Sequence, residues 1–130
     1  MNSATRALVR RRAANRCEYC RLPQQDLVTL TFHIEHVIAR QHQGSDDPAN
    51  LALACDRCNF HKGPNLSAID PVSGKTVSIF NPRKQQWDEH FRLDDYHVVG
   101  LTPIGRATVR LLNMNAARRV QLRQDAQERG

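Results

Sequence analysis

Aromatic residues and long apolar segments are scarce in this sequence. One Trp, two Tyr and four Phe among 130 residues are few for a protein that binds single-stranded nucleic acid by stacking bases on aromatic side chains. No apolar run approaches the roughly 18–20 residues of a membrane span, and the N-terminus lacks the apolar region of a secretory signal. We therefore expect a cytoplasmic protein that makes no contact with a membrane.

Lysine is also rare, but arginine is abundant. The chain has 19 basic and 13 acidic residues, a net charge of +6 and a pI near 9.7, and 16 of the basic residues are arginine. Guanidinium groups make bidentate contacts with phosphate, so this charge suits a polyanionic partner, although basic proteins with other partners also exist. The length predicts a single domain, residues 1–130, with a modest core.

Four cysteines form two pairs of the Cys-x2-Cys type, Cys17 with Cys20 and Cys55 with Cys58. Two such pairs are typical of zinc sites in which four thiolates surround a tetrahedral ion. Disulfides are disfavoured in a chain without an export signal. A site with four protein ligands leaves no position for a substrate, so we predict a structural zinc ion that also contributes to folding.

Turn residues and periodicity predict an α+β chain of short elements. Residues 4–16 are expected to form a basic helix, whose arginines lie either on a solvated face or on a DNA-contacting arm. The other predicted elements are a strand at 27–37, a loop at 41–50, a strand at 51–54, a helix from Asp56 to Gly63, a hairpin at 69–80, a helix at 85–91, a strand at 96–101, and helices from Pro103 and Ala116. No repeat or long linker divides the chain.

The side chains between and beside the cysteine pairs match the needs of phosphodiester hydrolysis. That reaction requires an activated water, neutralisation of the phosphate charge and help for the leaving oxygen. His36 is a candidate base, because histidine titrates near neutral pH. Glu35 and Asn59 offer a carboxylate and an amide oxygen, which suit a hard cation such as Mg²⁺ or Mn²⁺. Asn50 ends the predicted loop and is suited to backbone hydrogen bonds that would hold the loop and orient His36.

These residues, in this order, closely resemble the HNH endonucleases. The shared elements are Cys17-x2-Cys20, Glu35-His36, Gly44, Asn50-Leu51, Cys55-x2-Cys58-Asn59 and Lys62-Gly63. The resemblance covers about residues 17–63 and implies a zinc-braced ββα-metal core, flanked by the N-terminal helix and by a strand and helix extension at 64–130. It further implies an enzyme that cuts DNA to leave 5′-phosphate and 3′-hydroxyl ends.

The resemblance also implies roles for single residues. His36 would be the general base, Asn50 the middle Asn of the motif, and Glu35 and Asn59 the ligands of one divalent cation. The chain is an HNN-like variant, since Asn59 replaces the frequent third His and Glu35 replaces the usual Asp. His61 is a rival ligand, but residues two apart on a helix differ by about 200° and cannot easily serve one ion.

Several further residues are candidates for the same site. His33 shares a strand face with Glu35 and is either an extra ligand or substrate contact, or a histidine bonded at a strand edge. Strand alternation would send Glu35 and His36 to opposite sides, so the proposed chemistry requires the strand to end or bend at His36. Lys62 lies three residues after Asn59, on the same helical face. The candidate DNA contacts are Lys62, Arg40 and Arg10.

We predict a metal-dependent HNH endonuclease that acts on duplex DNA, with structural Zn²⁺ and catalytic Mg²⁺ or Mn²⁺, as a monomer or homodimer. Arginines in 6–16 and 106–123 are expected to contact phosphates. A zinc-ribbon module that binds nucleic acid without chemistry is one alternative, and a zinc-braced protein-interaction domain is another. The first explains the cysteines and the charge, but not why Glu35-His36, Asn50 and Asn59 stand at these positions. The second has no need of the arginine excess.

Overall fold

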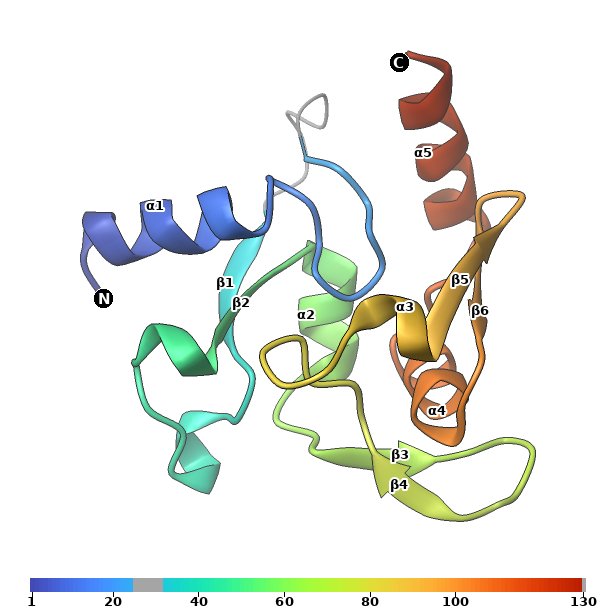
Figure 1. Cartoon of the computed structure of the whole chain (residues 1–130), viewed down its shortest axis with the longest axis horizontal. Coiled ribbons are helices and arrows are strands. Elements are labelled where there is room, and N and C mark those ends of the chain that lie inside the picture. The colour runs from blue at the N-terminus through green and yellow to red at the C-terminus, as the bar shows by residue number, and fades with distance from the viewer. Residues whose placement is uncertain (25–31, 130) are drawn as a thin grey trace.

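The computed structural model describes residues 1–24 and 32–129, which have an α+β fold. Three separate two-stranded antiparallel sheets alternate with short helices (Figure 1). The elements are α1 (Ser3–Arg12), β1 (His33–His36), β2 (Leu51–Ala54), α2 (Asp56–Lys62), β3 (Ser67–Ile69), β4 (Thr76–Ser78), α3 (Trp87–His90), β5 (Phe91–Asp94), β6 (His97–Gly100), α4 (Pro103–Leu111) and α5 (Ala117–Glu128). In the part of the chain described, no helix has the length and apolar character needed to cross a membrane.

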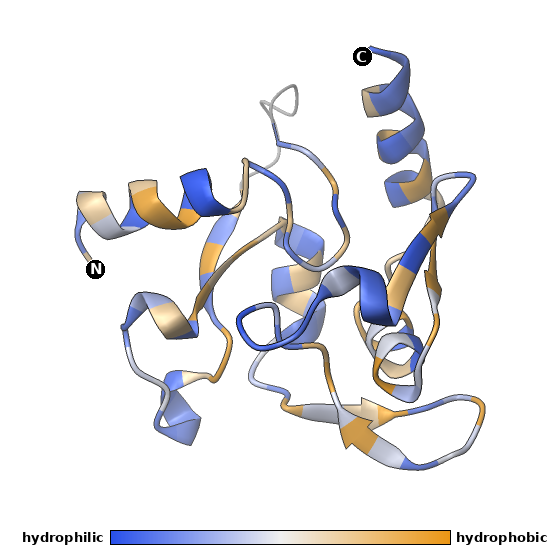
Figure 2. Ribbon diagram, viewed as in Figure 1, coloured by the Kyte–Doolittle hydropathy of each residue, from blue (hydrophilic) through white to orange (hydrophobic). Residues whose placement is uncertain are grey.

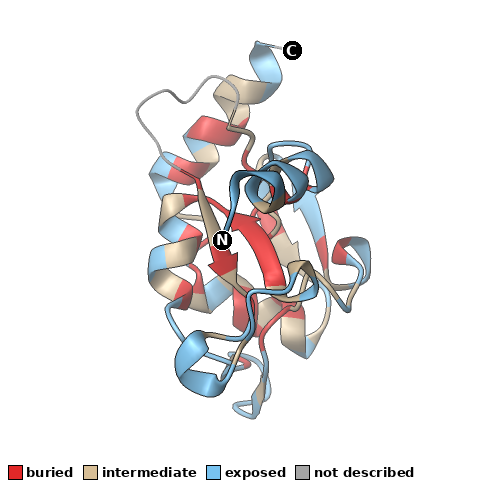
Figure 3. Ribbon diagram, turned by 90° about the vertical axis from the view of Figure 1, so that its left-hand side faces the viewer, coloured by how far each residue is buried: buried red, intermediate tan, exposed pale blue. Residues whose placement is uncertain are grey.

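A ββα unit made of β1, β2 and α2 lies at the centre of the molecule. β1 pairs antiparallel with β2, so that Glu35 lies opposite Ala52 and His36 opposite Leu51. The strand predicted at 51–54 is confirmed, and β1 ends at His36 as the proposed chemistry requires. The predicted strand residues 27–31 lie outside the described residues. All four β2 residues are buried, and Figure 3 shows this strand inside the molecule.

The first turn of α2 is formed by the second cysteine pair. Cys55 is the N-cap, and its Sγ accepts a hydrogen bond from the backbone N–H of Cys58 at 3.4 Å. Asp56 in the first turn interacts favourably with the positive end of the helix dipole. The helix stops at Gly63, whose φ of 49° is available to glycine without a side-chain clash. The predicted helix from Asp56 to Gly63 is therefore confirmed.

The residues after 64 share a core with the ββα unit. Most of the few aromatic side chains gather there: ring centroids of Phe80 and Phe91 are 5.1 Å apart, as are those of Trp87 and Phe91. Trp87 Nε1 donates to the carbonyl of Tyr19, which lies between the first two cysteines, at 2.8 Å. The extension is thus anchored to the first cysteine pair by its largest side chain.

The predicted hairpin at 69–80 is confirmed as β3 and β4, but β5 was not predicted. The helix expected at 85–91 is shorter, and Phe91 instead begins a strand that pairs with β6. The connection between β5 and β6 uses positive φ at Asp95 (47°) and Tyr96 (69°). Such turns usually carry glycine or asparagine, so Tyr96 gave no signal of a hairpin.

Helix α5 is docked against the cysteine cluster by arginines. It is largely hydrophilic (Figure 2), yet Arg119 and Arg123 are 3% and 6% exposed. Arg123 donates to the carbonyls of Cys20, Tyr96 and Met114 at 3.1, 2.8 and 2.7 Å. The expectation that these arginines contact phosphate is wrong, because their guanidinium groups are buried and hydrogen-bonded to other groups of the protein.

Candidate active site and metal centre

The four cysteines converge on one point, where they form the potential zinc site. Cys17, Cys20, Cys55 and Cys58 are all buried, and their sulfur atoms lie within 4.8 Å of one another. Cys20 Sγ and Cys55 Sγ are 3.7 Å apart. Zn–S bonds of about 2.3 Å in a tetrahedron place sulfur atoms about 3.8 Å apart, so the donor set fits a zinc ion.

A buried arginine lies against this cluster. Arg119 Nη2 is 2.7 Å from Cys58 Sγ and 3.6 Å from Cys55 Sγ, and Arg119 Nη1 donates to Asn113 O at 3.0 Å. Four thiolates around Zn²⁺ carry a net charge of −2, and a neighbouring guanidinium offsets part of it. Arg119 was not identified from the sequence as part of the metal centre, because 61 residues separate it from Cys58.

The connection between β1 and β2 is held by Asn50. Its Oδ1 accepts from Ile38 N at 2.9 Å, and its Nδ2 donates to the carbonyls of Ile38 and Ser45 at 3.0 and 2.9 Å. Gly44 leaves room for this closure, since a Cβ there would lie 1.7 Å from the Ile38 carbonyl oxygen. These contacts turn the chain away directly after His36.

His36 is paired with a carboxylate from this connection. Its Nε2 lies 2.7 Å from Asp46 Oδ1, and Arg40 Nη2 donates to both Asp46 oxygens at 2.9 and 3.1 Å. The pKa of the Asp46 carboxyl lies below its usual value, because His36 and Arg40 both donate hydrogen bonds to it. Arg40, a predicted DNA contact, is exposed but engaged with Asp46. Asp46 was missed because a loop has no periodicity from which to place a side chain.

A hollow of about 410 Å³ brings four of the predicted site residues together: Glu35, His36, Asn59 and Arg40 all line it. Asn50 and Lys62 are not among the lining residues, and neither are three further candidates: His33 and His61 are half-buried elsewhere, and Arg10 is half-buried on α1. Burial lowers the pKa of His61, and the charges of Arg119 and Arg57 add to this effect.

Lys62 lies inside the protein, so its predicted role as a phosphate contact is wrong. It is 1% exposed, and its Nζ lies 3.0 Å from Glu35 Oε2. The same ammonium donates to the carbonyls of Val37 and His36 at 2.9 and 3.3 Å. Tyr19 donates its hydroxyl to the other oxygen of Glu35. Burial raises the pKa of Glu35, while Lys62 and Tyr19 oppose the increase.

These contacts leave Glu35 able to bind a cation. Each carboxylate oxygen has two lone pairs, and the hydrogen bonds to Tyr19 and Lys62 use one on each. Glu35 and the amide oxygen of Asn59 would supply two protein oxygens at the hollow. Mg²⁺ commonly takes one or two protein ligands and fills the remaining positions with water and phosphate oxygens. The residues at the hollow therefore fit a hard divalent cation.

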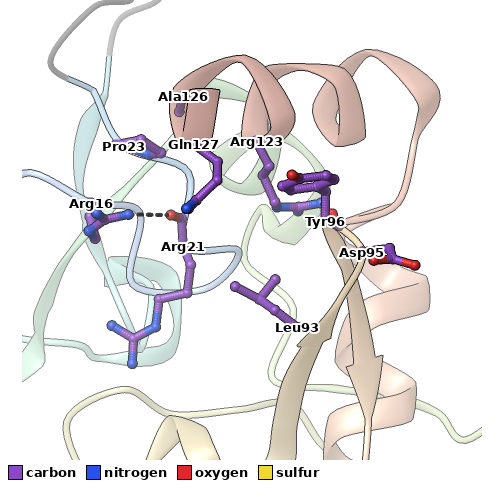
Figure 4. A pocket seen from close by; sticks show the side chains of 9 residues that line it. All are labelled: Arg16, Arg21, Pro23, Leu93, Asp95, Tyr96, Arg123, Ala126 and Gln127. Atoms are coloured by element: carbon purple, nitrogen blue, oxygen red, sulfur yellow. Dashed lines mark hydrogen bonds between the residues drawn. The ribbon is translucent and has the colours of Figure 1, made fainter. Parts of the chain in front are cut away.

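A second cavity, of about 530 Å³, lies between the segment 16–23, the β5–β6 turn and α5 (Figure 4). Arg16, Arg21, Tyr96 and Arg123 are among its lining residues. The Arg21 guanidinium lies 4.8 Å from the Trp87 ring centroid, and Arg16 donates to the Arg21 carbonyl at 3.4 Å. None of the predicted catalytic residues lines this cavity, so the candidate chemistry is confined to the smaller hollow.

The ββα unit, the cluster of four cysteines and the histidine at the end of β1 together define a zinc-braced ββα-metal core. Residues 17–65 match the family model described as HNH endonuclease. This matched segment is a little over a third of the chain. Comparison with curated proteins and with solved structures gives no significant match.

Proposed function

We propose that this chain is a metal-dependent endonuclease that hydrolyses phosphodiester bonds in duplex DNA, with His36 as the general base. The observation that carries the proposal is that His36, Glu35 and Asn59 line one hollow beside the cysteine cluster. A histidine next to two oxygen donors supplies both a proton acceptor and a cation site. The net charge of +6 suits a polyanionic substrate.

The chemistry follows from these positions. A divalent cation bound by Glu35 and Asn59 would neutralise charge on the phosphate and on the leaving oxygen. His36 accepts a proton from a water molecule, and the water oxygen bonds to phosphorus as the bond to the 3′ oxygen breaks. The 3′ oxygen then takes a proton from solvent, which gives 5′-phosphate and 3′-hydroxyl ends. Asn50 holds the loop that follows His36 and so keeps the imidazole at the hollow.

Supercoiled plasmid tests the proposal directly. Wild-type protein and His36→Ala are incubated with it in Mg²⁺, in Mn²⁺ and in EDTA. We expect metal-dependent conversion to open-circular or linear DNA by the wild type, and a loss of about 10²–10⁴-fold in the variant, the usual contribution of a general base. A zinc-loaded, folded wild type that binds DNA but leaves it uncut in every metal would overturn the proposal.

The buried Glu35–Lys62 pair favours one second candidate, a nucleic-acid-binding module without chemistry. In that case the 3.0 Å contact between Lys62 Nζ and Glu35 Oε2 would fully neutralise the carboxylate, and no cation would be needed. Cleavage separates the two candidates, because both bind DNA. The nuclease requires that His36→Ala lose cleavage by about 10²–10⁴-fold while its affinity for duplex DNA changes little, because the base acts only on the reacting water.

A further inference from the structure

The contact between His36 and Asp46 determines which imidazole nitrogen can act as the base. An ionised carboxylate can only accept hydrogen bonds, and a neutral imidazole has one N–H and one bare nitrogen. His36 Nε2 lies 2.7 Å from Asp46 Oδ1, so Nε2 carries the proton in this arrangement. The lone pair is then on Nδ1, for which no described residue provides a hydrogen-bond partner.

We propose that Asp46 is a positioning residue for His36: it holds the imidazole through Nε2–H, so that Nδ1 accepts the proton from water. The inference rests on the proposed nuclease function and assigns that reaction a residue which its sequence motif does not include. When Nδ1 takes the proton, the ring becomes a cation bonded to a carboxylate. A carboxylate that both orients a histidine and stabilises its charged form is a known device of general-base catalysis.

Asp46 is itself held in place from two directions. Arg40 Nη2 donates to both of its oxygens, at 2.9 and 3.1 Å. The backbone on the N-terminal side is fixed by the bond from Asn50 Nδ2 to Ser45 O at 2.9 Å. An exposed carboxylate with two fixed neighbours can therefore set the direction of the His36 ring.

The tautomer of His36 tests the contact without any need for cleavage. The zinc-loaded 130-residue chain, labelled with ¹⁵N at histidine, is examined by long-range ¹H–¹⁵N NMR near pH 8. The His36 signals are assigned by their loss in His36→Gln. We expect only the Nε2–H form in the wild type and a mixture of both forms in Asp46→Ala. A wild-type Nδ1–H form, or an unchanged tautomer in Asp46→Ala, would overturn the proposal.

Steady-state kinetics on plasmid or duplex DNA provide the second measurement. We expect Asp46→Ala to lower kcat by about 10–100-fold with KM changed little, because the carboxylate supports the base and not DNA binding. Asp46→Asn keeps an acceptor oxygen without the charge and should recover part of the loss. Asp47→Ala is the matched control: it removes one carboxylate and one hydrogen bond from the same loop and should stay within about threefold of wild type.

These measurements distinguish a failure of the positioning role of Asp46 from a failure of the nuclease function. Wild-type kcat in Asp46→Ala, or equal losses in Asp46→Ala and Asp47→Ala, would overturn the positioning role while the nuclease function stands. An inactive wild type with the expected tautomer would overturn the nuclease function, and with it the catalytic role of Asp46.

Discussion

The ammonium group of Lys62 is enclosed by three oxygen acceptors, those of Glu35, Val37 and His36. Removal of one partner of a buried ion pair leaves the other charge without compensation, which typically costs about 3–5 kcal/mol. We expect Lys62→Met to reduce the free energy of unfolding by that amount in urea titrations. Lys84→Met, at an exposed site, should stay within about 0.5 kcal/mol of wild type. Equal stability of the two variants would contradict a buried Lys62–Glu35 pair.

The carboxylate of Asp70 should make the free energy of unfolding depend on pH in the acid range. Its side chain is inaccessible to solvent, and it accepts from Ser73 Oγ at 2.8 Å and from Arg106 Nε and Nη2 at 2.9 Å each. Arg106, which was expected to contact phosphate, is thereby paired with Asp70. Hydrogen bonds from Arg106 hold the pKa of Asp70 well below its usual value, and those from Ser73 add to the effect.

The sign of the resulting pH dependence follows from that depressed pKa. The stabilisation by Asp70 is complete above its unfolded pKa of about 3.9 and is lost as the pH falls below it towards the folded value. We expect Asp70→Asn to be less stable than wild type at pH 7 and the difference to shrink at pH 3. Urea titrations at both pH values measure it, with exposed Asp88→Asn as the control. A constant difference would mean that Asp70 contributes through packing alone.

At the scale of elements, α5 is coupled to the metal centre through Arg119, whose Nη2 lies 2.7 Å from Cys58 Sγ. Loss of a group that hydrogen-bonds a metal ligand typically lowers metal affinity by about 10–100-fold. We expect this loss in Arg119→Gln, measured by competition with a chromogenic chelator. Arg118→Gln, one residue away and exposed, should keep wild-type affinity. Equal zinc affinity in both variants would show that α5 docks without influence on the metal.

Some elements could be predicted because they depend on residues that are close together in the sequence. α2 follows from the N-terminal Asp56 and the terminating Gly63, and the zinc site follows from cysteine spacing. Lys62 was wrongly expected to contact phosphate. Residues three apart on a helix share a face, so Lys62 lies on the same side of α2 as Asn59. The rule does not say whether that side faces solvent or the core. β5 was missed because Tyr96 adopts a positive φ without glycine. Asp46 and Arg119 depend on tertiary contacts, which local patterns do not encode.

At the scale of the whole molecule, the positive charge divides into internal and external groups. In the C-terminal extension, Arg119 and Arg123 are buried among carbonyls and thiols, and Arg106 is paired with Asp70. The arginines of α1 differ, since Arg6 and Arg11 are exposed and its last turn is wholly basic. We therefore expect phosphate contacts outside the active site to come from α1 more than from the extension.

The salt dependence of DNA binding tests this division. Each phosphate contact contributes about 0.9 to the slope of log K against log salt on duplex DNA. In a His36→Ala background, which prevents cleavage, we expect Arg6→Gln/Arg11→Gln to reduce the slope by about 1.8. The control Arg92→Gln/Arg110→Gln removes two exposed charges from the extension and should leave the slope near that of the parent. Fluorescence anisotropy of a labelled duplex across a KCl series measures all three proteins. The opposite pattern would assign the DNA-binding surface to the extension, and equal losses would mean that charge acts through the overall field of the protein rather than through α1.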